Sequence, residues 1–265
     1  MDPIEAFKAA QRKRWAHFAP FESHTTPSAA RLVMHARIRA GQRVLDVACG
    51  TGVVSVTAAR VGAHVTGLDL TPQLLQRARE NAAVGGVSID FHEGDVEALP
   101  FADASFDVVT SQYGHMFAPR PAVAIAEMLR VLKPGGTIAF STWPPEVFVG
   151  RMFSLVASYL PPPTAGVAAP PSWGDVGVVL ERLGDAVRDV RFDRAVAFIP
   201  ALSPQHYRDN AERTSGPLIA LVESLSAGAP DRLAEFRRAY DELTSEYFEN
   251  NVIRQDYLMT GAIKA

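Results

Sequence analysis

The sequence has little cysteine and little excess charge of either sign. Cys49 is the single cysteine among 265 residues, so no disulfide can form within the chain, which is typical of a reducing compartment. The formal net charge of −3 argues against a nucleic-acid-binding surface. No apolar run approaches the ~18 residues of a membrane span, and the N-terminus lacks the apolar core of a signal peptide. We therefore expect a cytoplasmic protein with no transmembrane segment and no nucleic-acid partner.

The composition is that of a globular protein with a normal core. Hydrophobic residues make up 48% of the chain and charged residues 21%. A length of 265 residues fits one large domain. No cluster of His, Cys, Asp or Glu has the spacing of metal ligands, so we expect no metal site.

The stretch from Val44 to Gly52 reads Val-Leu-Asp-Val-Ala-Cys-Gly-Thr-Gly. A buried strand leads into a tight glycine turn, and residues 53–60 then have the apolar character of a helix. Gly50 and Gly52 can take positive φ and let a ligand approach the backbone. The helix that follows offers free N–H groups to the same ligand. The pattern therefore predicts a small-molecule site at this turn.

Two other glycine-rich motifs fit this stretch less well. A dinucleotide fingerprint would have a third glycine where Ser55 stands, and a P-loop would continue with Gly-Lys-Ser/Thr. Asp46 on the strand suits a positively charged ligand rather than a pyrophosphate. The stretch closely resembles the first motif of class I S-adenosylmethionine methyltransferases, which holds the methionine end of the cofactor. The resemblance implies cofactor contacts from Asp46, Ala48, Gly50, Thr51 and Gly52.

Two further acids follow hydrophobic runs. Asp69 ends the strand expected at 64–69, where a carboxylate can accept hydrogen bonds from both ribose hydroxyls. Leu70 is expected to pack on the adenine or on the sheet. Asp95 and Val96 resemble the family residues that bind the exocyclic amine and the ring of adenine. A doubly wound sheet collects such residues at the carboxyl ends of its strands.

The fourth strand, expected at 106–111, ends at Ser111, which we assign to the cofactor site. His115 in the loop that follows is the first candidate for a general base, because a neutral imidazole accepts a proton near pH 7. Tyr113 is expected to orient the substrate. His17 and His24 are rivals for the role of base if the N-terminal segment folds over the site. The loop lacks the Asn/Asp-Pro-Pro-Tyr/Phe motif, which disfavours methylation of DNA adenine or of glutamine.

Three later sequence motifs make the family resemblance more specific. They are Leu99-Pro100-Phe101, Ser105 to Val109, and Arg130 to Gly136. Together they are similar to the ubiquinone/menaquinone-biosynthesis branch of small-molecule methyltransferases (methyltransferase type 11), over about residues 40–143. This resemblance implies S-adenosylmethionine as cofactor, S-adenosylhomocysteine as product and a small-molecule acceptor. Apolar helices in the C-terminal half suggest a hydrophobic or aromatic acceptor. Two alternatives stay open: a non-catalytic regulator that binds these adenosyl ligands, and a nicotinamide-dependent oxidoreductase.

The expected fold class is α/β, a doubly wound Rossmann-like seven-stranded sheet, mostly parallel. In the resembling fold the final strand runs antiparallel between the fifth and the sixth. We expect one domain, with N-terminal helices or a lid and helical lid elements in the C-terminal half. Its divisions are 1–40 (N-terminal helices), 41–143 (cofactor core), 144–185 and 203–250 (helical insertions near the substrate), and 187–199 and 256–264 (last strands).

Two helical segments allow more than one interpretation. Residues 4–18 have apolar side chains at helical spacing and a basic side that includes Lys8. They can form a helix packed on the body, a lid, or an interfacial helix in peripheral contact with anionic lipid. Thr26-Pro27 predicts the start of a second helix that runs to about Arg39. A narrow apolar seam at 233–247 fits packing on the body or a homodimer, so monomer and dimer both stay open.

Overall fold

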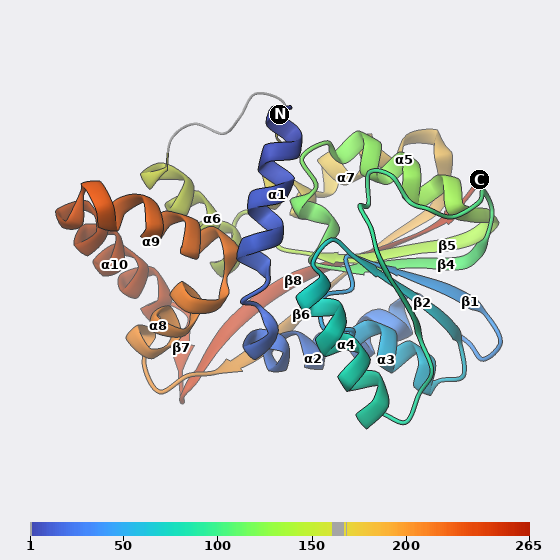
Figure 1. Cartoon of the computed structure of the whole chain (residues 1–265), viewed down its shortest axis with the longest axis horizontal. Coiled ribbons are helices and arrows are strands. Elements are labelled where there is room, and N and C mark those ends of the chain that lie inside the picture. The colour runs from blue at the N-terminus through green and yellow to red at the C-terminus, as the bar shows by residue number, and fades with distance from the viewer. Residues whose placement is uncertain (1, 161–166, 168) are drawn as a thin grey trace.

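The computed structural model describes residues 2–160, 167 and 169–265. Its centre is one eight-stranded sheet with the order β3-β2-β1-β4-β5-β8-β6, and the short β7 pairs with β8 outside this path. Helices cover both faces of the sheet, and a second group of helices lies beside it (Figure 1). Part of the insertion expected at 144–185 lies outside the described residues, namely 161–166 and 168.

Five strands form the parallel part of the sheet. They are β1 (Arg43–Val47), β2 (His64–Asp69), β3 (Asp90–Glu93), β4 (Phe106–Gln112) and β5 (Leu132–Thr142). The chain steps outward from β1 through β2 to β3, then returns to the other side of β1 with β4 and β5. The order therefore reverses between β1 and β4. In such sheets the ligand binds outside the carboxyl ends of the strands at that point.

The antiparallel strand lies where the resemblance implied. β8 (Val252–Lys264) is inserted between β5 and β6 (Val187–Pro200) and runs antiparallel to both. The doubly wound fold class is thereby confirmed. The sheet has one strand more than expected, because β7 (Phe248–Glu249) turns back on the start of β8. β6 and β8 also pair beyond the end of β5, which extends the sheet as a two-stranded ribbon below the helices (Figure 1).

The central strands are buried on both faces, which explains their continuous apolar sequence. Val44 of β1 belongs to the hydrophobic cluster with α2 (Glu22–His35) and α3 (Val53–Arg60). Its neighbour Leu45 belongs to the cluster on the opposite face, with α5 (Pro121–Val131) and α7 (Val176–Leu183). α4 (Pro72–Val84) packs against β2, β3 and α3.

Four helices of the C-terminal half pack together as a cap beside the sheet: α6 (Phe148–Tyr159), α8 (Pro204–Thr214), α9 (Gly216–Gly228) and α10 (Pro230–Ser245). α1 (Pro3–Trp15) runs between this cap and the sheet (Figure 1). The seam side chains Leu233, Phe236, Tyr240 and Leu243 are buried inside the chain, which fits packing on the body rather than a dimer seam. Within the described ranges no helix is long and apolar enough to cross a bilayer.

The predicted helix start at Thr26-Pro27 is wrong. A 3₁₀ turn at Ala19–Phe21 leads directly into α2, which begins at Glu22, contains Pro27 and ends at His35. Side-chain donors supply hydrogen bonds in the turn before the proline. The hydroxyls of Thr25 and Thr26 donate to the Glu22 carbonyl (3.0 and 2.8 Å), and the Gln112 amide donates to the Thr25 carbonyl (2.8 Å). These side-chain contacts support the first two turns of the helix, next to the proline.

Candidate active site

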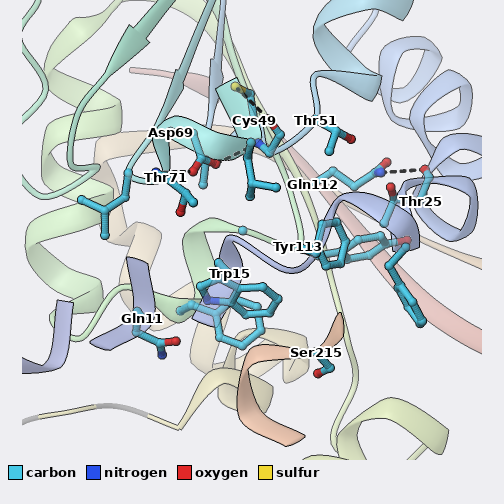
Figure 2. A pocket seen from close by; sticks show the side chains of 18 of the residues that line it. Gln11, Trp15, Thr25, Cys49, Thr51, Asp69, Thr71, Gln112, Tyr113 and Ser215 are labelled. Atoms are coloured by element: carbon cyan, nitrogen blue, oxygen red, sulfur yellow. Dashed lines mark hydrogen bonds between the residues drawn. The ribbon is translucent and has the colours of Figure 1, made fainter. Parts of the chain in front are cut away.

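A cavity lies at the carboxyl ends of β1, β2, β3 and β4, and residues of α1 and of the helical cap line its other side. Figure 2 shows Thr51, Asp69 and Thr71 on one side of it and Trp15 and Ser215 on the other. Eight of the residues expected to bind cofactor line it: Asp46, Ala48, Gly50, Thr51, Asp69, Leu70, Asp95 and Val96. Tyr113 lines it as well.

The glycine loop takes left-handed backbone conformations at three alternate positions. Ala48, Gly50 and Gly52 have φ values of 51°, 55° and 78°. A Cβ on Gly50 would meet nothing within 4 Å, so this residue leaves open space for a ligand. A Cβ on Gly52 would lie 3.1 Å from the Ala78 Cβ. Gly52 therefore serves the packing of the loop on α4 and is not among the cavity-lining residues.

Asp69 connects the glycine loop to the turn that follows β2. Its two carboxylate oxygens accept the backbone N–H groups of Gly50 and Thr71, each at 2.8 Å. Burial raises the pKa of Asp69, and the N–H groups of Thr71 and Gly50 oppose that rise. A carboxylate has about four acceptor positions, so the remaining ones can take two further donors.

Asp46 is buried below the loop at 1% exposure. Its oxygens accept hydrogen bonds from Ser55 Oγ (2.6 Å) and Thr110 Oγ1 (3.5 Å). Burial raises the pKa of Asp46 to about 7, against the hydrogen bond from Ser55, and the nearby charge of Asp69 adds to the rise. Ser55, at the position of the third glycine of a dinucleotide motif, thus supports an acid rather than a pyrophosphate. The structure does not favour the nicotinamide alternative.

Asp95 is held by the N-terminal helix, which the sequence did not reveal. Its carboxylate accepts the Glu97 N–H (2.9 Å) and the ammonium of Lys8 (2.6 Å). Lys8 belonged to the expected basic side of the first helix, but its side chain is only 9% exposed. No local signal marks it, because α1 and the Asp95 loop are far apart in sequence.

Ser111 lies beneath the cavity and is not among its lining residues. Its hydroxyl donates to the Val47 carbonyl (2.7 Å) and accepts the His115 N–H (3.1 Å). These bonds tie the end of β4 to β1 and to the loop that carries Tyr113. Ser111 can therefore influence a ligand only through the position of that loop.

Tyr113 has a strained backbone and a packed ring. Its φ of 61° is unusual for a bulky residue, and such strain clusters at functional sites. The ring stacks on Trp143 with centroids 4.0 Å apart and planes 15° apart. Burial raises the pKa of the phenol well above its usual value, and the nearby Ser28 hydroxyl offsets this only in part. Tyr113 and Trp143 together form one aromatic wall of the cavity.

His115 is not a cavity-lining residue, contrary to what a general base at this site would need. It is 0% exposed, and its ring packs between Phe140 and Trp173, with centroids 4.7 Å from each. Burial lowers its pKa to about 3, and the charge of Arg182 contributes. The backbone is left-handed at Tyr113, with a φ of 61°, and the 3₁₀ turn His115–Phe117 that follows begins with the buried imidazole.

The far half of the cavity is aromatic, and the sequence predicted only its apolar character. Its rings come from α1, the turn before α2, the β4 and β5 loops, and the helical cap: Phe7, Trp15, Phe18, Phe21, Phe117, Trp143, Phe153, Tyr207 and Tyr240. Several buried polar atoms here find no hydrogen-bond partner in the described part of the chain: His24 Nδ1, Gln112 Oε1, Tyr113 Oη and Tyr240 Oη. His24 lines this half, whereas His17 does not, and burial lowers the pKa of His24 to about 4.

Comparisons with known proteins agree with this geometry. A family model described as a methyltransferase domain matches residues 45–140. The chain is 38% identical over 264 residues to Rv1403c of Mycobacterium tuberculosis, named as an uncharacterized protein, with 98% of this chain and 96% of that protein covered. A stretch of 103 residues is 47% identical to the ubiquinone biosynthesis O-methyltransferase of Hahella chejuensis, covering 38% of this chain and 43% of that protein.

The fold also matches a solved methyltransferase. A Haemonchus contortus N-methyltransferase, in complex with phosphomonomethylethanolamine and S-adenosylhomocysteine, superimposes with a TM-score of 0.55 at 20% identity, over 90% of this chain and 52% of that one. The residues in the cavity suit such a cofactor. Asp69 has acceptor positions left for two hydroxyls, Gly50 leaves open space, and the Thr51 hydroxyl is buried without a partner among the described residues. Residues 45–140 are therefore a methyltransferase domain of the S-adenosylmethionine-dependent class, and the cofactor that this domain implies is S-adenosylmethionine.

Proposed function

We propose that this methyltransferase acts on a small, neutral, hydrophobic acceptor with a ring hydroxyl. The observation that carries the proposal is the aromatic lining of the cavity beyond the cofactor residues. Aromatic and apolar surface with a few polar atoms is the usual composition of a site for such a molecule. The ubiquinone biosynthesis relative is an O-methyltransferase by name, which agrees with an oxygen acceptor.

The cofactor residues divide by the part of the molecule that each would hold. Asp69 would accept the two ribose hydroxyls, and Leu70 would pack beside the adenosyl group. Asp95 would accept a hydrogen bond from the exocyclic amine, and Val96 would offer its backbone N–H to the ring. Asp46 and the Gly50-Thr51 turn would receive the charged methionine end. Bound S-adenosylmethionine supplies an electrophilic methyl group on a sulfonium, so the chain's main task is to align an acceptor atom with it.

The charges around the cavity favour a neutral acceptor. Among the lining residues that the structure describes, Lys8 is the only lysine or arginine. Its ammonium is already paired with Asp95 and Glu97, at 2.6 and 2.7 Å. The acids of the lining, Asp46, Asp69 and Asp95, all belong to the cofactor end. A phosphate, a free carboxylate or a cationic amine would thus enter the far half without a counter-charge, which is costly.

The polar atoms of the far half would bind and orient the hydroxyl. The Tyr113–Trp143 wall offers a flat surface for an aromatic ring. His24 is neutral at pH 7, since its pKa is about 4, and can accept a hydrogen bond from the acceptor. Tyr240 Oη can donate to a second oxygen. His24 replaces His115 in this proposal as the imidazole that faces the acceptor.

Turnover with a matched panel of acceptors tests the proposal. The panel pairs a hydroxylated aromatic or quinol with its carboxylated and aminated analogues, and S-adenosylhomocysteine is measured together with the mass of the product. We expect a gain of one methyl group on the neutral hydroxyl compound and at least ~10-fold lower kcat/KM for the charged analogues, about 1.4 kcal/mol. Tyr113→Phe should lower kcat/KM without changing affinity for S-adenosylhomocysteine.

Two results would count against the assignment. A preference for the charged analogues would show that the far half binds ions. Tight binding of S-adenosylmethionine with no turnover on the panel or on cell extract would favour the regulator alternative instead.

A further inference from the structure

We propose that Lys8 is a positioning residue for the adenine end of the cofactor: α1 completes the base site by fixing the carboxylate of Asp95. This inference uses the role proposed above for Asp95. It goes further by making cofactor recognition depend on a helix outside the cofactor core.

The first support is the position of the Lys8 ammonium. It lies 2.6 Å from Asp95 Oδ2 and 2.7 Å from Glu97 Oε2, while the Glu97 N–H binds Asp95 Oδ1 at 2.9 Å. Both oxygens of Asp95 are therefore held by donors, which fixes the plane of the carboxylate. The free lone pairs then face one defined direction, as a hydrogen bond from an exocyclic amine requires.

The second support is a buried anchor behind the ammonium. The Glu97 side chain is 0% exposed and also accepts the backbone N–H and the guanidinium of Arg120, at 2.6 and 2.9 Å. Glu97 remains paired when Lys8 is replaced, so loss of the ammonium does not leave an isolated buried charge. The network joins α1, the Asp95 loop and the start of α5. Burial opposes the charged form of Lys8, but its two carboxylate partners outweigh this and raise its pKa.

The third support is the contrast with Arg12, one turn further along the same helix. Arg12 pairs with Glu93 of β3, but the two side chains are 44% and 46% exposed. Exposed pairs of this kind contribute little. Arg12 is also absent from the lining of the cavity, whereas Lys8 is part of it. The two residues thus offer a matched pair on one helix.

A binding cycle with a modified ligand tests the inference. Dissociation constants are measured by calorimetry for S-adenosylhomocysteine and for its 6-deamino analogue, which lacks the exocyclic amine. The proteins are wild type, Lys8→Met, Lys8→Arg and Arg12→Met. We expect Lys8→Met to weaken S-adenosylhomocysteine by about 10-fold or more and the deamino analogue by less than about 2-fold. Lys8→Arg should recover most of the affinity for S-adenosylhomocysteine that Lys8→Met loses. Arg12→Met should change neither dissociation constant.

The modified ligand separates positioning from a merely structural role. Equal losses for both ligands in Lys8→Met, or no loss for either, would overturn the inference. A wild type that binds both ligands alike would overturn it together with the assignment of Asp95. Thermal melts of the ligand-free variants confirm folding, and Lys8→Arg provides a second variant that keeps the charge. Binding is measured without turnover, so an error in the proposed acceptor leaves this test unaffected.

Discussion

The two halves of the cavity are built on different principles. The cofactor half uses backbone N–H groups and carboxylates whose hydrogen bonds are made in advance, as at Asp69 and Asp46. The far half uses aromatic side chains and polar atoms, such as Tyr240 Oη, that have no partner in the described residues. The first half has its carboxylates fixed by hydrogen bonds within the chain, whereas the second keeps several polar atoms available for a ligand.

The largest effect is expected where one residue supports both the loop and the ligand. Asp69→Ala removes the acceptor of the Gly50 and Thr71 N–H groups and the proposed acceptor of the ribose hydroxyls. We expect the Kd for S-adenosylhomocysteine to rise at least ~100-fold, about 2.7 kcal/mol, in calorimetric titration. Asp69→Asn retains one carbonyl oxygen and should lose less. An Ala variant that is folded and binds normally would contradict the preorganised character of this half.

This contrast also explains what the sequence could predict. The cofactor half lies within short segments at the ends of consecutive strands, so Asp46, Asp69 and Asp95 could be placed at one edge from local patterns and the doubly wound topology. Lys8 could not, because its partners depend on how α1 packs on a loop far away in sequence. The stacking of Trp143 on Tyr113 depends on two separate loops, after β5 and after β4. His115 was misplaced for a similar reason. Periodicity does not tell on which side of a 3₁₀ turn a side chain emerges, and here the turn that follows the left-handed Tyr113 places His115 in the core.

The next effect concerns the contact between the halves at Gly114. A Cβ there would lie 2.5 Å from the Ala48 Cβ and 2.7 Å from its carbonyl oxygen. We expect Gly114→Ala to lower the free energy of unfolding by ~1–3 kcal/mol and to weaken the cofactor, because the glycine loop must shift. Ala48→Gly removes one of these contacts and a left-handed alanine, so it should partly rescue Gly114→Ala. Denaturant melts of the two single variants and the double variant measure this coupling.

The pH dependence of cofactor affinity tests the charge state of Asp46 in the cofactor half. Burial raises the pKa of Asp46 to about 7. A cationic methionine end favours the ionised form, so binding should lower this pKa and release a proton. The affinity for S-adenosylmethionine should therefore rise with pH, about 10-fold between pH 6 and pH 8. Asp46→Asn should flatten the profile, and a flat wild-type profile would show that Asp46 does not face the charge.

The smallest expected effect is the difference between substitutions of two neighbouring tyrosines in the far half, Tyr207 and Tyr240. Tyr207 Oη accepts the Gln255 amide at 2.7 Å, whereas Tyr240 Oη has no partner in the described part of the chain. Their rings lie 6.5 Å apart and nearly parallel, at 18°. Tyr207→Phe leaves the Gln255 donor buried and should cost ~1–3 kcal/mol of stability.

Tyr240→Phe removes a hydroxyl that satisfies no other group, so the free energy of unfolding should change by less than ~0.5 kcal/mol or rise. If the hydroxyl serves the acceptor, KM for the hydroxylated aromatic should increase a few-fold while the Kd for S-adenosylhomocysteine stays constant. Denaturant melts and acceptor kinetics on the two variants measure both quantities. Equal destabilisation by the two substitutions would mean that Tyr240 is structural, and the far half would then be as fully bonded as the cofactor half.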